Sequence, residues 1–396
     1  VSMLYLLLLF AILVCRDSEA GTAVVQKAKV GGSNGCALIA EVRRIKCWGS
    51  NKYGVLGTGN SSDVFGNEPG EMGDDLPFVN LGTGMDGMIE SFSMGGFHVC
   101  AVSTEGKLKC WGVGEFGGLG LEDVNGRGDD PDEMGDNLPF VQIGTGRTVL
   151  SVSCGTLSTC VVMDTRQIKC WGSDYEGSIG STSPENGLVG AAPGEMGDNL
   201  LPVALPTGSL VKQVSCANIH TCVVLVDGDV YCFGAGLAIG LPGYESANPY
   251  ELGNSLPKVD LGGNAVDKIY TGMDWTCALF VDGKVRCFGV NSNGVLGTGT
   301  TSDVGLNTTD MGSNLTAITL DAGRTVLSIG LSETGVCAVL DDHSLVCWGD
   351  GVTSPSLPYG FGDRTYKILS VEGAGALTNE YTLSTWCATW DDTPYP

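Results

Sequence analysis

Residues 100–112 read Cys100-Ala-Val-Ser-Thr-Glu-Gly-Lys-Leu-Lys-Cys110-Trp111-Gly112. The central Glu-Gly dipeptide has the composition of a tight turn, and the apolar residues on either side predict two antiparallel strands. This pairing places Cys100 directly opposite Cys110. Opposed residues at a non-hydrogen-bonded position are roughly 4.5–5.5 Å apart, which is within the range that a disulfide accepts. The stretch therefore predicts a β-hairpin whose two strands are joined by a disulfide.

The same hairpin occurs six times along the 396 residues, each time with two cysteines about ten residues apart and then Trp-Gly or Phe-Gly. The first cysteines recur at intervals of 64, 60, 62, 55 and 60 residues, which is typical of one repeat array rather than of unrelated domains. Reduced, buried cysteines that act as small apolar residues are the alternative. We predict one disulfide in each repeat, and the six pairs are Cys36 with Cys47, Cys100 with Cys110, Cys160 with Cys170, Cys222 with Cys232, Cys277 with Cys287, and Cys337 with Cys347.

Beyond its hairpin, each repeat continues with a Leu-Gly or Ile-Gly signal, a polar segment and a short apolar run that ends in glycine. Short apolar stretches bounded by Gly, Asp and Asn predict strands, and no window shows a sustained helical period. The chain is therefore predicted to be all-β. A unit of this size cannot bury both faces of its sheet alone, so the sheets are expected to stack on one another in a radial array.

These motifs resemble the repeats of the regulator of chromosome condensation family. The matching residues include His98-Val-Cys100-Ala-Val102, Cys110-Trp-Gly112 and Gly118-Leu-Gly120, and they recur at Cys287-Phe-Gly289 and Gly294-Val-Leu-Gly297. The resemblance covers essentially everything after Ala20 and implies a seven-bladed β-propeller in which the Trp or Phe after the second cysteine packs between blades. The expected repeats are 24–84, 87–146, 149–208, 210–263, 265–322, 325–364 and a partial repeat at 365–396.

Three cysteines fall outside both the six pairs and the apolar N-terminal segment. Cys387 matches the first cysteine of a repeat, and its partner would fall just past Pro396, so we expect the last blade to be truncated. Cys154 and Cys216 each lie six residues before a first cysteine, at equivalent positions of consecutive repeats. They either bridge neighbouring repeats or remain buried thiols, and the sequence leaves both options open.

The N-terminus contains a run of twelve largely apolar residues at 4–15, followed by small residues at Ser18 and Ala20. This pattern predicts a signal peptide at 1–20 and a single propeller domain at 21–396. Twelve residues are too few to cross a bilayer, so no stable membrane span is expected. An apolar N-terminus buried in the fold is the alternative. Since disulfides persist in oxidising compartments, we predict a secreted protein or one in the lumen of the secretory pathway.

Three sequons support that route. They are Asn60-Ser-Ser, Asn307-Thr-Thr and Asn314-Leu-Thr, all in loop-like segments, and we predict N-glycosylation at these asparagines.

The charge of the chain argues against nucleic acid as a partner. The sequence has 21 Lys and Arg against 45 Asp and Glu, a formal net charge of −24, so phosphates would be repelled. The founding member of the family is a nuclear guanine-nucleotide exchange factor docked on chromatin. Exchange on a small GTPase is therefore kept only as an alternative function, because the predicted disulfides and signal peptide place this chain away from the nucleus.

No catalytic, cofactor or metal site is predicted. The only histidines are His98, His220 and His343, and the first two stand where the family commonly has a histidine, which favours a structural role. Nucleophile elbows, phosphate loops and Cys-x-x-Cys zinc motifs are missing from the sequence. The recurring Glu-Met-Gly-Asp segments at 71–74, 133–136 and 195–198 bind calcium or form solvated turns, and both remain open.

An Arg-Gly-Asp tripeptide at 127–129 lies in an acidic insertion, where a chance occurrence is favoured over an adhesion motif. The sequence as a whole predicts a secreted, non-enzymatic propeller that binds a protein or glycan through its rim loops. A secreted enzyme inhibitor is a further alternative.

Overall fold

The computed structural model describes residues 25–31, 34–181, 187–242, 252–292, 294–320, 323–331, 335–342, 344–349, 367–372 and 387–391. In these residues the chain forms strands, turns and short 3-10 helices but no α-helix, which confirms the predicted all-β class. No described helix has the length and apolar character needed to cross a membrane. The predicted signal peptide, His343 and most of the predicted last repeat lie outside the described residues.

The described strands form seven antiparallel sheets, and in chain order they contain β1 (Val25–Gly31), β2 (Asn34–Ile39), β3 (Arg44–Ser50) and β4 (Val64–Phe65); β5 (Ile89–Met94), β6 (His98–Ser103) and β7 (Leu108–Gly112); β8 (Val149–Cys154), β9 (Ser158–Met163), β10 (Ile168–Ser173) and β11 (Leu188–Val189); β12 (Val211–Cys216), β13 (His220–Leu225) and β14 (Val230–Gly234); β15 (Val266–Thr271), β16 (Trp275–Phe280) and β17 (Val285–Gly289); β18 (Val326–Leu331), β19 (Gly335–Leu340) and β20 (Leu345–Gly349); and β21 (Lys367–Glu372) with β22 (Cys387–Asp391). The 3-10 helices are η1 (Gly73–Asp75), η2 (Gly135–Asn137), η3 (Tyr175–Gly177), η4 (Leu237–Ile239), η6 (Gly253–Ser255), η7 (Thr308–Asp310) and η8 (Gly312–Asn314).

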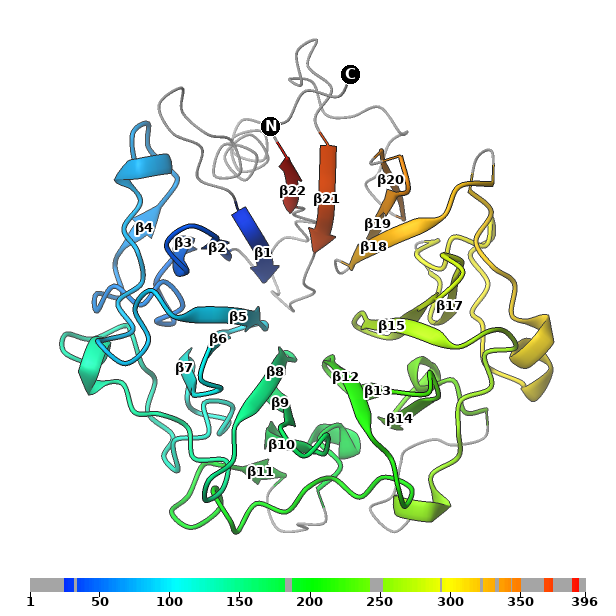
Figure 1. Ribbon diagram of the computed structural model, residues 1–396, viewed down its shortest axis with the longest axis horizontal. Helices are drawn as coiled ribbons and strands as arrows, with labels where there is room; N and C mark the ends of the chain where they lie inside the picture. Colours follow the sequence, from blue (N-terminus) through cyan, green and yellow to red (C-terminus); the bar gives the residue numbers. More distant parts are fainter. Residues whose placement is uncertain are drawn as a thin grey trace.

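The seven sheets are arranged in a ring around a central axis (Figure 1). The first strand of each sheet, from β1 to β21, lies innermost, and later strands lie progressively further out. β1 contacts β21 and β22, so the last sheet meets the first and the ring closes. This arrangement confirms a propeller-type fold. The number of complete blades stays a prediction, because the last sheet has two described strands.

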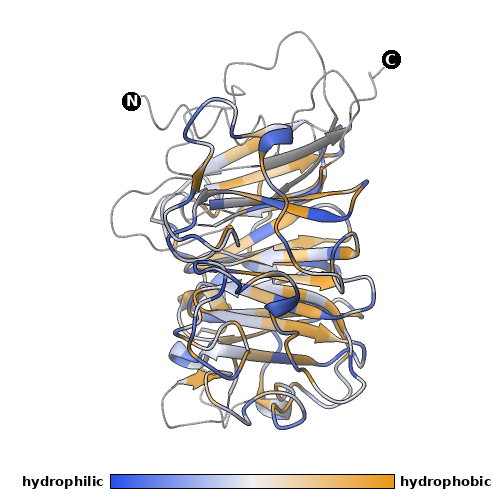
Figure 2. Cartoon of the chain, turned by 90° about the vertical axis from the view of Figure 1, so that its left-hand side faces the viewer, coloured by the Kyte–Doolittle hydropathy of each residue, from blue (hydrophilic) through white to orange (hydrophobic). Residues whose placement is uncertain are grey.

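The disc has two faces, which the turns of the sheets define. Face A carries the turns between the first and second strands of a sheet, at 95–97, 155–157, 217–219 and 272–274. The loops that follow the third strand begin on the same face. Face B carries the hairpin turns between the second and third strands, such as 104–107 and 226–229. Seen edge-on, the hydrophobic residues run along the strands between these two faces (Figure 2).

The aromatic residue after each second cysteine packs between sheets, as the repeat pattern predicts. Trp111 and Trp171 are fully buried. Trp111 Nε1 donates to the carbonyl of Val55 at 2.9 Å, and Trp171 Nε1 donates to the carbonyl of Gly118 at 3.0 Å, each in the preceding repeat. A buried indole of this kind contributes about 3–5 kcal/mol relative to alanine. These side chains therefore hold consecutive sheets together.

Glycine at the end of an inner strand allows the sheets to approach near the axis. A Cβ on Gly95 would clash with the carbonyl oxygen of Gly155, and a Cβ on Gly155 would clash with that of Ala217. Only glycine, which has no Cβ, therefore fits where the ring is narrowest.

Candidate functional site

The structure joins all six predicted cysteine pairs by disulfides. In each pair the two cysteines are directly opposed in the register, as Cys100 is to Cys110, and their Cα atoms are 4.0 to 4.1 Å apart. The second cysteine of each pair, on the third strand of its sheet, bonds to the first in the order predicted, and these second cysteines are Cys47, Cys110, Cys170, Cys232, Cys287 and Cys347.

The first five bridges are nearly inaccessible to solvent, including both Cys47 and Cys232. In the sixth, Cys337 is buried and Cys347 is partly buried. The hairpin signal in the sequence was sufficient to place all six pairs.

Cys154 and Cys216 are free thiols, which decides between the two options that the sequence left open. Both are buried, and burial raises the pKa of each thiol to about 12. The backbone amide of Cys154 donates to Ser93 Oγ, and that of Cys216 donates to Ser153 Oγ, both at 3.0 Å. A serine on one inner strand thus holds the next inner strand in place.

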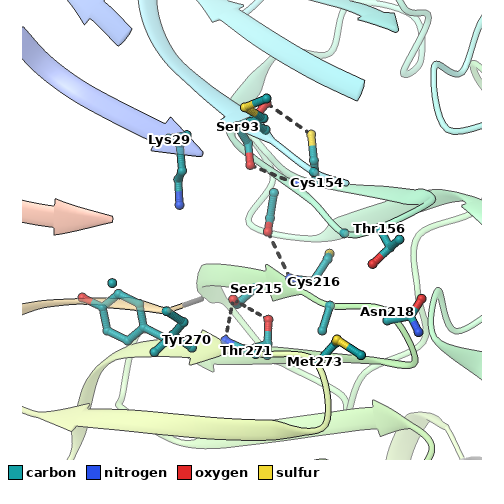
Figure 3. A pocket seen from close by; sticks show the side chains of 18 of the residues that line it. Lys29, Ser93, Cys154, Thr156, Ser215, Cys216, Asn218, Tyr270, Thr271 and Met273 are labelled. Carbon is teal, nitrogen blue, oxygen red and sulfur yellow. Dashed lines mark hydrogen bonds between the residues drawn. The ribbon is translucent and has the colours of Figure 1, made fainter. Parts of the chain in front are cut away.

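A small pocket of about 90 Å³ lies at the axis, between the ends of the inner strands and the face A turns (Figure 3). Hydroxyl groups and backbone line much of it, and Lys29 extends toward the same space from β1. Sites for small organic ligands usually measure 300–1,000 Å³. The axial pocket is therefore too small for most metabolites.

The two described histidines have a structural role. His98 Nε2 lies 2.7 Å from Thr159 Oγ1, and His220 Nε2 lies 2.9 Å from Thr276 Oγ1, in each case across a sheet boundary. Burial lowers the pKa of His98 to about 4 and that of His220 to about 3, so both imidazoles are neutral at neutral pH. Neither has the solvent access that acid or base chemistry requires.

The Glu-Met-Gly-Asp segments are capped turns. Glu71 Oε2 accepts hydrogen bonds from the amides of Gly66, Asn67 and Glu68 at 3.0 to 3.1 Å. Glu133 and Glu195 each accept two amide hydrogen bonds in the same manner. These contacts favour the turn interpretation of the segments over calcium binding, because the carboxylates already have backbone donors.

The aspartates of these segments reach neighbouring repeats. Asp136 accepts hydrogen bonds from the amide and hydroxyl of Thr83 at 2.8 and 3.0 Å. Asp198 does the same for Thr145, at 2.8 and 2.6 Å, and these bonds hold the pKa of Asp198 below its usual value. The segments are thus connectors between repeats.

Buried lysines form a contact that the sequence reasoning missed. Lys109 Nζ donates to the carbonyls of Leu81 and Gly135, both at 2.8 Å, and Lys169 makes the equivalent pair of bonds. Burial lowers the pKa of Lys109, although the negative charges of Asp136 and Asp86 oppose that shift. The signal was present as the recurring Lys-Cys-Trp tripeptide, but only the fold shows that the lysine points inward.

The Arg-Gly-Asp tripeptide is built into its own loop. The Arg127 guanidinium pairs with Asp123 at 2.7 Å and donates to the carbonyls of Asn125 and Gly126. The carbonyl of Gly128 accepts a bond from Asn51 of the preceding repeat at 2.8 Å. These contacts favour a structural role for the tripeptide.

Exposed aromatic and acidic residues gather on the face A loops. The side chains of Tyr53, Phe116 and Tyr175 are 42%, 37% and 61% exposed, and each follows the third strand of its sheet. Tyr53 also packs edge-on against Phe97 of the next sheet, with ring centroids 5.6 Å apart. Exposed aromatic residues on a rigid scaffold are typical of protein interfaces.

The charge on face A is mostly negative. Lys52 is the only cation in the segments 51–54, 95–97, 114–118, 155–157, 174–177, 217–219 and 272–274. Glu115 and Glu176 are exposed there. Asp174 and Asp274 are partly buried, and burial raises the pKa of both carboxyl groups.

Face B carries paired charges instead. Its ion pairs include Arg43 with Glu90 at 2.7 Å and Lys212 with Asp267 at 2.6 Å. We therefore define the face A patch as Tyr53, Phe97, Glu115, Phe116, Tyr175 and Glu176.

The three predicted glycosylation sites, Asn60, Asn307 and Asn314, are exposed in loops. Their modification stays a prediction.

Comparisons with known proteins agree with this fold. Residues 89–117 match the model of the regulator of chromosome condensation (RCC1) repeat. The chain is 28% identical over 336 residues to the ultraviolet-B receptor UVR8 of Arabidopsis thaliana, a match that covers 83% of this chain and 66% of that receptor. It is 29% identical over 227 residues to the probable E3 ubiquitin-protein ligase HERC4 of Homo sapiens, which covers 57% of this chain and 19% of that protein.

The chain thus spans less than two thirds of the length of these relatives. Among solved structures, human WBSCR16 superposes with a TM-score of 0.64 at 14% identity, covering 91% of this chain and 86% of that one. Yeast RCC1 (Prp20) bound to Kap60 gives a TM-score of 0.59 at 17% identity, covering 91% and 80%. Taken with the sixfold cysteine hairpin and the ring of antiparallel sheets, these matches place the chain in an RCC1-like family.

Proposed function

We propose that this chain is a secreted, non-enzymatic, protein-binding propeller that docks a basic partner on the face A patch. The observation that carries the proposal is the combination of exposed aromatic rings with carboxylates and a single cation on one face of a rigid ring. Aromatic side chains provide contact area at low cost in conformational entropy, while unpaired carboxylates attract a positively charged surface.

The relatives support a binding role. The solved complex of yeast RCC1 with Kap60 is an RCC1 propeller bound to another protein. Loops on a rigid scaffold are the usual location of recognition residues. A non-enzymatic role is supported by the two described histidines, which are buried and hydrogen-bonded in the sheet boundaries, and by the small size of the axial pocket.

Secretion is supported by the six disulfides, which are consistent with an oxidising compartment. The formal charge of −24 favours a basic protein over an anionic glycan or nucleic acid. A glycan partner is therefore an outcome of the test rather than part of the proposal.

The test captures partners from culture medium and cell surfaces with the purified glycoprotein. One variant replaces Tyr53, Phe116 and Tyr175 with serine, and the matched control replaces Val226 and Val281, which are 59% and 63% exposed on face B. We expect a basic protein that binds the unmodified chain and the control but binds the face A variant at least roughly tenfold more weakly, since interface aromatic residues each contribute 1 kcal/mol or more.

Equal binding by the face A variant would overturn the docking site. Capture of glycans alone would overturn the protein partner, and retention of the chain inside cells would favour nucleotide exchange instead.

A further inference from the structure

Three potential metal ligands from two neighbouring sheets meet in the interior. One nitrogen of His98 and the sulfurs of Cys100 and Cys154 all lie within 4.8 Å of one another. His98 and Cys100 belong to β6, and Cys154 ends β8 of the next sheet. All three side chains are buried.

The oxidation state of Cys100 decides what this cluster can bind. In the structure Cys100 is bonded to Cys110, so its sulfur carries no negative charge and the cluster offers two ligands, His98 and Cys154. A dithiol reductant would donate two electrons to this disulfide and become oxidised to its own disulfide, which leaves thiols on Cys100 and Cys110. Reduction therefore raises the number of ligands from two to four.

We infer that the reduced chain binds one zinc-class cation through Cys100, Cys110, Cys154 and His98. Three cysteines and one histidine are an established ligand set for structural zinc, in tetrahedral geometry. With Zn–S bonds of about 2.3 Å, ligand sulfurs in such a site are roughly 3.8 Å apart. The separations of up to 4.8 Å between His98, Cys100 and Cys154 thus need only a small contraction.

The proton and charge balance is also acceptable. Zn²⁺ displaces one proton from each of the three thiols and binds the neutral imidazole, so three protons are released and the site carries one negative charge. His98 is neutral in this environment, as a histidine ligand must be.

The other sheet boundaries provide built-in comparisons. Cys216 occupies in the next sheet the position of Cys154, but the residue at the position of His98 is there Ser158. His220 has the position of His98, but Thr271 stands where Cys154 would be. In the part of the chain that the structure describes, the boundary between β6 and β8 is the one that combines a histidine with a free thiol.

The test is a titration of the full chain with Co²⁺ and then Zn²⁺, before and after reduction by a dithiol under argon. Tetrahedral Co²⁺ with thiolate ligands has sulfur-to-metal charge-transfer bands and intense visible d–d bands, so the ligand set is read directly. We expect one Co²⁺ per reduced chain, displaced by Zn²⁺, and no such spectrum from the oxidised chain.

Four variants decide the assignment. Cys154→Ser and His98→Gln each remove one ligand and should weaken binding at least roughly tenfold. Cys216→Ser and His220→Gln alter the equivalent positions of other sheets and should leave it unchanged. Absence of a thiolate spectrum in the reduced chain would overturn the inference. It would also be overturned if Cys154→Ser and Cys216→Ser behaved alike, which is the result expected if reduction merely unfolds the chain and exposes its thiols.

Discussion

His98 donates a hydrogen bond from Nε2 to the hydroxyl of Thr159 in the neighbouring sheet, at 2.7 Å. The direction follows from the second bond of that hydroxyl, which donates its own hydrogen to the carbonyl of Gly118 at 2.8 Å. His220, Thr276 and the carbonyl of Ala238 repeat the same chain of bonds. Two sheet boundaries therefore depend on a neutral imidazole that donates through Nε2.

This dependence predicts a loss of stability in acid. An unfolded histidine has a pKa near 6.5, whereas His98 and His220 in the fold have lowered values of about 4 and about 3. Between these values the unfolded chain takes up protons that the folded chain cannot, so the free energy of unfolding falls as the pH drops below about 6.5. At pH 5 the loss should be about 2 kcal/mol per histidine.

Urea unfolding at pH 7 and pH 5 measures this loss. In His98→Gln the amide can still donate to Thr159 but does not titrate, so the difference in stability between the two pH values should shrink by about 2 kcal/mol. Carboxylates titrate equally in both proteins and cancel in the comparison. An unchanged difference would mean that His98 is not held neutral.

Removing one disulfide should lower stability without changing the fold. Each bridge closes a loop of 10 or 11 residues, for which the chain-entropy model gives about 3 kcal/mol. We expect Cys160→Ala with Cys170→Ala to lower the free energy of unfolding by that amount in a urea titration. The free thiol Cys216 provides the control, because Cys216→Ala removes a buried sulfur but no cross-link. Equal effects in the two proteins would contradict the prediction.

Much of the fold was predictable because the decisive contacts are local in sequence. Cys100 and Cys110 are ten residues apart on one hairpin, and the turn between them sets their register. The face A patch and the cluster of His98 with Cys154 were not predictable in this way. Their members are separated by whole repeats and meet only when the sheets stack, so no local spacing indicates them. The carboxylates of the Glu-Met-Gly-Asp segments were visible, but their backbone donors were not.

The buried lysines should contribute to stability despite their charge. Lys109→Met removes the ammonium but leaves the carbonyls of Leu81 and Gly135 without this donor, and an unsatisfied buried polar group costs about 1–3 kcal/mol. We expect a loss of about 2–4 kcal/mol in the free energy of unfolding. Lys107→Met is the matched control, because Lys107 is half exposed and pairs with Glu105 at the surface, where ion pairs contribute little. Similar losses in both variants would show that the inward bonds of Lys109 are unimportant.

Glycosylation tests the proposed route of the protein. Asn60, Asn307 and Asn314 are exposed, and the Ser62 hydroxyl of the first sequon already donates to Asn60 Oδ1 at 2.8 Å. When the full chain is expressed in a eukaryotic secretory system, we expect an endoglycosidase to lower its apparent mass. Each Asn→Gln change should remove one step of that shift. A secreted protein with no shift would refute glycosylation while leaving the disulfides unaffected.

Reversing charge on face A should slow association with the proposed partner. Glu115 and Glu176 are exposed beside Phe116 and Tyr175, in loops where Lys52 is the one cation, so they supply long-range attraction more than contact energy. Glu115→Lys with Glu176→Lys should therefore lower the association rate about tenfold or more at low salt. The difference should shrink as the ionic strength rises past 0.15 M, where charges more than about 8 Å apart are screened. Surface plasmon resonance at several salt concentrations, with the face B change Glu105→Lys as control, separates this effect from loss of contacts. A defect that is independent of salt, or one that the control shares, would show that charge on face A does not guide binding.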